Sequence, residues 1–472
     1  MNALPPRPRG HVVILGGGFT GATVAWHLAL QPLPPSITVV EPRPFLGGGL
    51  AYSSEEPSHR VNVPAARMSL VPDEPEHFSR WLAHDGEAER DPDAVWRNGD
   101  IFPRRRVFGR YVAEQLAPYL EAGAIRHVRD HAGKMQRSGD GWVVTVSGQP
   151  IAADVVVLAM THPSPDVPAP LQPIADADGF VADVYSGDAL GSVTPQASVL
   201  IVGSGLTAAD TVAELDRRGH RGRILAMSRH GLRSRGHPQQ RGQPFGDFAS
   251  APPATALALL KRVRSTLAAA EVDGVNWQSV FDQLRLQGGL LWSALEPGER
   301  TRLVRRLRVF WDVHRFRIAP QVEAVLERRR DEGTFENIAA SLVASNDDGH
   351  DLAVTLRRRG QRQFETMRFD AVINTTGPAH GKALHTNPTL RSLADAGMIR
   401  IDRHGLGIET ASDSRAIGPG DQPLSGLFIA GPLARGTFGE LMGLPEVARN
   451  AQAVAAEIRN RLGALSSIAS AR

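Results

Sequence analysis

The chain has 472 residues, of which 42% are hydrophobic and 22% are charged, and its formal net charge is +3. This length is too great for a single compact core, so we expect about two or three domains. The longest uninterrupted apolar run, residues 155–160, is too short to span a bilayer. The absence of cysteine excludes dithiol electron relays, thiolate zinc sites and cysteine nucleophiles.

The first predicted unit is a βαβ unit near the N-terminus. An apolar strand over 11–15 leads through a glycine-rich turn into a helix over 22–30, and a second strand covers 37–40. Residues 1–10 hold no apolar run before this first strand, so we expect no secretory leader and a cytoplasmic protein.

The glycine-rich turn of this unit has the spacing of a dinucleotide site. Gly16 permits the tight bend, Gly18 lets the backbone approach a pyrophosphate, and Gly21 allows close helix packing. The N-terminus of the helix offers amide donors and a partial positive charge to phosphates. Glu41, directly after the second strand, is placed to accept hydrogen bonds from an adenosine ribose. The candidate residues of this first site are Gly16, Gly18, Phe19, Thr20, Gly21 and Glu41.

A mixed segment and several short strands follow. We expect a helix over 109–122, strands over 125–128 and 142–146, and a strand over 155–160 that returns to the first sheet. Prolines and serines over 163–168 then indicate a connection to a second unit.

The second predicted βαβ unit covers about 197–228 and has its own glycine-rich turn. Its second strand ends in Ser228 and Arg229 rather than in an acidic residue. An acidic residue at this position would repel a 2′-phosphate on the ribose. Because arginine offers a forked pair of charged donors to a phosphate, we expect NADPH rather than NADH here. The candidate residues of this second site are Gly203, Gly205, Leu206, Thr207, Ser228 and Arg229.

The rest of the chain divides into a helical part and a return to strands. Apolar residues at three- and four-residue spacing over 254–270 and 299–313 indicate helices. Strands are expected over 338–343, 352–357, 364–375 and 426–431, and a closing helix over 445–462. The domains we expect are a first dinucleotide-binding domain over 1–165 and 366–472, a second over 190–235 and 338–365, and a helical insertion over 236–337. The predicted fold class is therefore α/β, with two Rossmann-like domains, the second inserted in the first.

With these motifs, the chain resembles the bacterial FAD/NAD(P)-binding family of two-dinucleotide-binding-domain flavoproteins, near the flavin-dependent N-hydroxylating and class B monooxygenases. The stretches that carry the resemblance are GGGFTG with Glu41, VNVPAARMS, GSGLTAAD, WDVHRFRIAP and GPLARGTFGE. The resemblance implies FAD in the first site, with Gly48 and Asn62 near the flavin and Gly431 near the ribityl chain. Many relatives have Gly-Asp where this chain has Gly431-Pro432, so an acidic contact to the cofactor is absent here.

Two further clusters are open to more than one interpretation. Residues 311–317 either face a substrate or NADPH, or form one face of an amphipathic helix with local salt bridges. The same alternatives apply to His59 and Arg60. No metal-binding, serine-hydrolase or nucleic-acid-binding motif is present, so we expect none of these activities.

These observations favour an FAD-dependent oxidoreductase that oxidises NADPH. The resemblance implies a monooxygenase that hydroxylates a small molecule with molecular oxygen through a flavin C4a-hydroperoxide. Two alternatives stay open: a flavin-dependent reductase or dehydrogenase without oxygen insertion, and a flavin-bound interaction or sensor protein that uses the helical insertion. The sequence does not indicate the substrate, the catalytic side chains or the oligomeric state.

Overall fold

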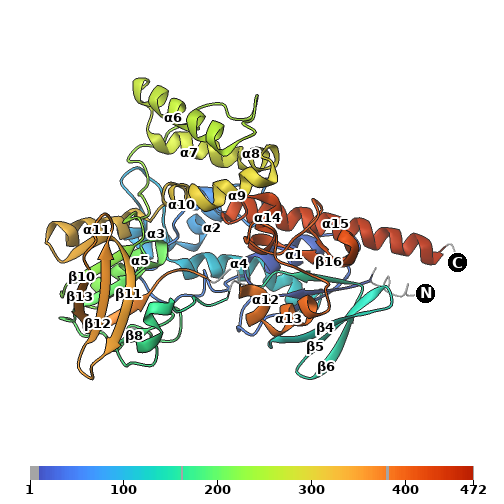
Figure 1. Cartoon of the computed structure of the whole chain (residues 1–472). Coiled ribbons are helices and arrows are strands. Elements are labelled where there is room, and N and C mark those ends of the chain that lie inside the picture. The colour runs from blue at the N-terminus through green and yellow to red at the C-terminus, as the bar shows by residue number, and fades with distance from the viewer. Residues whose placement is uncertain (1–9, 161–162, 379–381, 471–472) are drawn as a thin grey trace.

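A computed structural model describes residues 10–160, 163–378 and 382–470 of the chain (Figure 1). It contains a six-stranded sheet, a seven-stranded sheet and a three-stranded sheet. The two larger sheets lie in separate lobes, and a group of helices forms a third lobe above them in this view.

The six-stranded sheet is the core of the first domain and is parallel except at one edge. Its order is β15, β16, β7, β1, β2, β3, and only the pair of β15 and β16 is antiparallel. The central strand β7 is completely apolar and β1 is apolar after His11, which suits a sheet that is covered on both faces. The strands are β1 (His11–Leu15), β2 (Ser36–Val40), β3 (Ile125–Val128), β7 (Val155–Leu158), β15 (Arg415–Ile417) and β16 (Pro423–Ile429).

Helices cover this first sheet, and a small antiparallel sheet lies beside it. Helix α1 packs against both α15 and α4, so the first and last long helices of the chain lie together. The helices of this domain are α1 (Phe19–Ala29), α2 (His77–Asp85), α3 (Glu87–Arg90), α4 (Arg105–Glu121), α12 (Ala383–Thr386), α13 (Pro388–Asp395), α14 (Arg435–Phe438) and α15 (Leu444–Ser470). The small sheet consists of β4 (Ala132–Ser138), β5 (Gly141–Val146) and β6 (Gln149–Ala153).

The seven-stranded sheet is the core of the second domain. Its order is β13, β12, β11, β10, β9, β14, β8, with parallel pairing from β11 to β8 and antiparallel pairing from β11 to β13. Helix α5 (Leu206–Arg217) connects the first two parallel strands of the second βαβ unit and packs against α11 (Pro320–Asp331). The strands are β8 (Phe180–Val181), β9 (Val199–Val202), β10 (Ile224–Ser228), β11 (Phe335–Asp347), β12 (Leu352–Arg358), β13 (Glu365–Phe369) and β14 (Ala371–Asn374).

The helical insertion lies between β10 and α11. It has its own small apolar cluster, which includes Phe248, Val280 and Leu284. Its helices are α6 (Ala256–Val272), α7 (Trp277–Leu286), α8 (Gly288–Ala294), α9 (Pro297–Arg306) and α10 (Arg308–Arg315). No helix in the described part of the chain has the length and apolar content that crossing a membrane requires.

The α/β fold class with two Rossmann-like domains is confirmed, but two expected boundaries are wrong. The return to the first domain does not begin at residue 366, because β14 pairs with β9 in the second sheet. The insertion does not extend over the whole of 236–337, since α11 packs on α5 as a helix of the second domain. A short apolar run fits either parallel sheet equally well, and only strand pairing decides between them.

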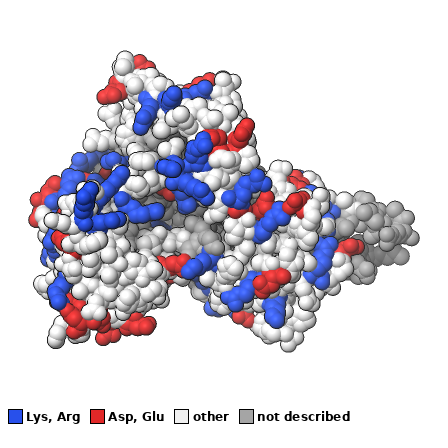
Figure 2. Space-filling model, viewed as in Figure 1, with Lys and Arg blue, Asp and Glu red and all other residues white. Residues whose placement is uncertain are grey.

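The lobes meet around a hollow in the surface, which Figure 2 shows from the same side as Figure 1. Arginine and lysine side chains gather beside this hollow over the second domain and the helical insertion. Both glycine-rich turns lie at the carboxyl ends of parallel strands, where ligands of open α/β sheets bind.

Candidate functional site

The first glycine-rich turn is closed tightly by backbone contacts. Gly16 has a φ of +98°, and a Cβ atom there would lie 2.5 Å from the carbonyl oxygen of Ala159. A Cβ atom at Gly21 would lie 1.9 Å from the carbonyl oxygen of Gly16. Neither position can hold a side chain, so the glycine spacing is a requirement of the bend between β1 and α1.

Glu41 stabilises the turn from the neighbouring strand. One carboxylate oxygen, Oε2, accepts a hydrogen bond from the amide of Gly17 at 2.8 Å. The other oxygen, Oε1, accepts bonds from the amide and the guanidinium of Arg43 at 3.1 Å and 3.0 Å. Because a carboxylate has about four acceptor positions, one on Oε2 is left for a ribose hydroxyl. That role of Glu41 stays a prediction.

The segment that contains Gly48 lies directly over this turn. The amide of Gly47 donates to the carbonyl oxygen of Gly17 at 2.7 Å, and a Cβ atom at Gly18 would lie 3.3 Å from Cα of Gly49. The ring of Phe19 packs against Phe108, with 5.5 Å between the centroids. The expected first-site residues on the turn and on this segment are therefore neighbours.

Gly431 reaches the same place from the far end of the chain. Its φ is +70°, its amide donates to Oδ1 of Asn450 at 2.8 Å, and a Cβ atom there would lie 2.6 Å from Oγ1 of Thr20. Asn62 lies on another loop, and its backbone carbonyl oxygen is 3.0 Å from Nε2 of His237. Burial and the nearby Arg317 lower the pKa of His237 to about 4, so the neutral ring donates this hydrogen bond.

The second glycine-rich turn repeats the geometry of the first but is open to solvent. Gly203 has a φ of +122°, and a Cβ atom there would lie 2.4 Å from the carbonyl oxygen of Thr375. Gly205 is exposed, and a Cβ atom there would have no heavy atom within 4 Å. Leu206 and Thr207 begin α5 immediately after it. The backbone at Gly205 is therefore accessible to a ligand.

Ser228 and Arg229 stand at the end of β10, beside this turn. The amide of Gly203 donates to the carbonyl oxygen of Met227 at 2.9 Å, which fixes the two segments next to each other. The Oγ atom of Ser228 is buried without a hydrogen-bond partner among the described residues. Arg229 is exposed, and no described residue forms a hydrogen bond or an ion pair with its side chain. The side chain of Arg229 is thus available to a ligand on the turn, whereas Oγ of Ser228 is covered by neighbouring atoms.

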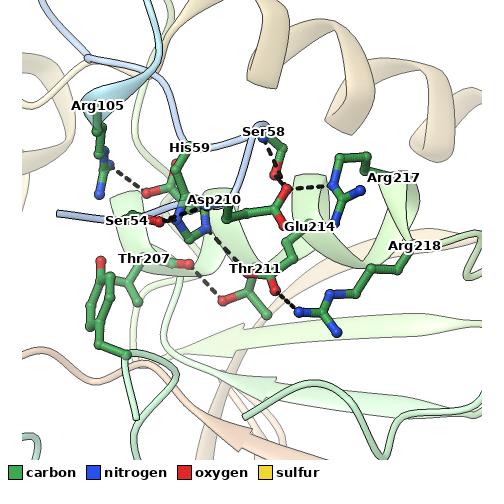
Figure 3. A network of polar contacts seen from close by, with 12 residues as sticks. Ser54, Ser58, His59, Arg105, Thr207, Asp210, Thr211, Glu214, Arg217 and Arg218 are labelled. Atoms are coloured by element: carbon green, nitrogen blue, oxygen red, sulfur yellow. Dashed lines mark hydrogen bonds and ion pairs between the residues drawn. The ribbon is translucent and has the colours of Figure 1, made fainter. Parts of the chain in front are cut away.

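A network of polar contacts joins the first domain to helix α5 of the second (Figure 3). Nη2 of Arg105, at the start of α4, lies 2.5 Å from Oδ2 of Asp210 on α5. His59 lies between the domains, with Nε2 3.2 Å from Oε2 of Glu214 and Nδ1 2.7 Å from Oγ of Ser54. A third contact, between Arg217 and Glu56, is bidentate at 2.5 Å and 2.7 Å. These contacts fix helix α5, and with it the second turn, against the first domain.

The cluster over 311–317 makes long-range contacts as well as local ones. Arg308 and Asp312 form a local pair at 3.2 Å. Arg315 instead donates two hydrogen bonds to Oε1 of Glu440, at 3.1 Å and 2.8 Å, and both side chains are only 5% exposed. Arg317 pairs with Asp282 at 2.9 Å. The amphipathic interpretation alone did not predict the contact with the return segment, because 125 residues separate its partners.

The described residues include no group of three His, Asp or Glu side chains arranged as metal ligands. The polar residues of the two sites instead lie around glycine-rich backbone. This arrangement suits phosphates and ribose hydroxyls.

Comparisons with known proteins agree with this geometry. A family model described as FAD-NAD(P)-binding matches residues 13–163. No curated protein sequence matches the chain.

Several solved structures have the same fold over almost the whole chain. An ornithine N-hydroxylase from Kutzneria sp. 744, solved with reduced FAD, NADP⁺ and L-ornithine, has a TM-score of 0.63 at 18% identity, covering 97% of this chain and 100% of that chain. An L-lysine 6-monooxygenase from Pseudomonas syringae has a TM-score of 0.64 at 17% identity, covering 95% and 99%. A thioredoxin reductase from Lactococcus lactis has a TM-score of 0.52 at 12% identity, covering 96% and 99%.

Proposed function

From this two-dinucleotide-binding-domain flavoprotein fold, we propose that the protein is an FAD-dependent monooxygenase that oxidises NADPH. The overall reaction would consume NADPH, a proton, oxygen and a small organic substrate, and would release NADP⁺, water and the hydroxylated substrate. Bound FAD would supply the redox chemistry, accepting a hydride from NADPH and passing the electrons to oxygen.

The observation that carries the proposal is the pairing of a closed turn with an open one. The first turn is covered by residues 47–49 and by Gly431, as suits a cofactor that stays bound. The second turn is exposed at Gly205 and adjoins Arg229, as suits a coenzyme that must enter and leave at every cycle. The residues therefore fit a resident FAD and an exchanging NADPH.

The chain's own groups would bind and orient both cofactors. The first amides of α1 and α5 would donate to the two pyrophosphates, and Glu41 would accept from the ribose of FAD. Arg229 would hold the 2′-phosphate of NADPH. The contacts of Arg105 and His59 would keep the two turns in a fixed relation, as hydride transfer between the cofactors requires.

Two neighbours favour oxygen insertion over simple reduction. The ornithine and lysine enzymes are named as a hydroxylase and a monooxygenase. Each match covers almost the whole length of that enzyme. The thioredoxin reductase is the neighbour with the lower TM-score, and this chain has no cysteine with which to pass electrons to a disulfide.

Rapid mixing of the NADPH-reduced protein with oxygenated buffer tests the proposal. We expect yellow protein whose flavin, after reduction, gives a transient absorbance distinct from both the reduced and the oxidised forms. Direct return to oxidised flavin would identify a reductase. Colourless protein that does not bind added FAD would overturn the assignment altogether.

A further inference from the structure

The helical insertion and the return segment of the first domain line a cavity of about 380 Å³ that is partly open to solvent. Its walls are almost entirely apolar and come from helices α6 to α10, including Val263, Leu267, Leu291 and Trp311. A volume of this size falls in the range of small-molecule sites. The cavity is distinct from both glycine-rich turns.

Four charged side chains line the cavity, and two of them come from the first domain. Arg435 and Glu440, both on the return segment, line it together with Arg308 of α10 and the exposed Arg264 of α6. Glu440 forms an ion pair with Arg315, and Arg308 forms one with Asp312. Two of these four side chains are therefore paired, whereas Arg264 and Arg435 form no ion pair among the described residues.

Arg435 forms no direct ion pair among the described residues, although the carboxylates of Asp312 and Glu440 act on its charge. Its side chain is buried, and Nε donates to the carbonyl oxygen of Gly439 at 3.3 Å. Among the described residues, no hydrogen-bond partner and no carboxylate within 4 Å is found for its two Nη atoms. Burial and the nearby Arg308 lower the pKa of this guanidinium, and the carboxylates of Asp312 and Glu440 oppose that shift. A buried cation in this state is stabilised by an anion that brings its own two oxygens.

We propose that this cavity binds an organic acid with an apolar body, whose carboxylate pairs with Arg435 and whose alkyl or aryl part lies between the insertion helices. Resting on the proposed monooxygenase function, this acid is the substrate class. Arg435 follows Gly431, which contacts Thr20 in the first turn, so Arg435 belongs to the segment beside the candidate FAD site.

The same observations disfavour the amino acids named for two of the neighbours. Ornithine and lysine each have two ammonium groups, and one of them would have to lie against leucine and tryptophan side chains. Placing an ammonium group there without a counterion is strongly unfavourable. An apolar acid has no such group, and each methylene buried should raise its affinity about fourfold.

Equilibrium binding to the full-length, flavin-loaded protein tests the assignment, with tryptophan fluorescence as the readout because Trp292 and Trp311 line the cavity. The probes are decanoate, dodecanoate, dodecylamine, dodecanol and L-ornithine. We expect dodecanoate to bind about tenfold or more tightly than decanoate, and dodecylamine and L-ornithine to bind far more weakly.

Two variants distinguish recognition of the ligand's carboxylate from burial of its alkyl chain. Arg435→Gln should weaken dodecanoate at least tenfold and leave dodecanol unchanged, whereas Val263→Trp should fill the cavity and weaken both. Arg306→Gln is the matched control, since Arg306 is exposed on α9 and does not line the cavity. Equal binding of dodecylamine and dodecanoate, or full affinity in Val263→Trp, would overturn the site.

NADPH oxidation, measured separately, distinguishes failure of this inference from failure of the proposed function. Acceleration of NADPH oxidation by dodecanoate, lost in Val263→Trp, supports the substrate assignment. If dodecanoate binds as expected but leaves the oxidation rate unchanged, the cavity is a binding site and its role as the substrate site is wrong. If the protein carries no flavin and still binds dodecanoate through Arg435, the proposed function alone fails.

Discussion

Arg105 and Asp210 connect the two nucleotide-binding domains through an almost buried ion pair. Nη2 of Arg105 lies 2.5 Å from Oδ2 of Asp210, and the two side chains are 12% and 9% exposed. Asp210 lies on α5, one turn after the second glycine-rich turn. The pair therefore places the candidate NADPH site relative to the first domain.

Asp210→Asn should destabilise the protein, because it leaves the guanidinium of Arg105 buried without its counterion. We expect the free energy of unfolding to fall by about 2 to 4 kcal/mol, measured by urea denaturation. Arg106→Gln is the control. Arg106 is the next residue on α4, and it forms a solvent-exposed ion pair with Glu55 at 2.6 Å. Its loss should change stability by less than about 1 kcal/mol, and equal effects of the two variants would contradict a structural role for the buried pair.

Arg229→Ala should weaken NADPH about tenfold or more, as expected for the loss of a charged hydrogen-bond donor to phosphate. NADH, which has no 2′-phosphate, should be affected far less. The measurement is the KM of each coenzyme for reduction of the bound flavin. Arg223→Gln, at the opposite end of β10, is the matched control and should leave both values unchanged. A parallel loss of NADPH and NADH binding in Arg229→Ala would rule out recognition of the phosphate.

The same substitution at corresponding positions of the two turns should have different effects. Gly205→Val meets open space, so we expect a folded, yellow protein whose affinity for NADPH falls roughly tenfold or more. Gly18→Val pushes its branched side chain against Gly49 and should yield protein with little flavin. Visible absorbance of the purified variants measures their flavin content, and coenzyme titration measures their affinity for NADPH. Retention of full flavin content in Gly18→Val would count against the first site.

The pKa of His237 makes stability depend on pH. Because it is lowered from 6.5 in the unfolded chain to about 4 in the folded protein, the unfolded state binds the proton first as the pH falls. The stabilisation is complete above pH 6.5 and is lost between pH 6.5 and 4, by about 1 to 3 kcal/mol. Urea unfolding at several pH values should show a shallower decline in His237→Gln. Since the carboxylates titrate in both proteins, only the difference between the two curves reports on His237.

The sequence predicts well what depends on local spacing. The strands on either side of each turn, the glycines at Gly16 and Gly203, and the return of 155–160 to the first sheet follow from short apolar runs and glycine positions. These features have a local cause, since each glycine is required by backbone atoms of its own turn or of the adjacent strand.

The sequence does not predict what depends on the packing of distant segments. Arg105 and Asp210 are 105 positions apart in the sequence, and nothing in it indicates that the two side chains meet. The assignment of β14 to the second sheet and the burial of Arg435 beside the cavity likewise depend on neighbours that only the folded chain brings together. The apolar spacing over 254–270 and 299–313 indicates helices, but not that they surround a cavity.

The nested path of the chain also sets an order for folding during synthesis. The seven-stranded sheet has all its strands once residue 374 has emerged from the ribosome. The six-stranded sheet begins at residue 11 but is complete only after β16 over 423–429 has been made. Until then the apolar edge of β7 has no partner, and such edges promote aggregation. Nascent chains that stop between these points should therefore be the forms that most depend on chaperones.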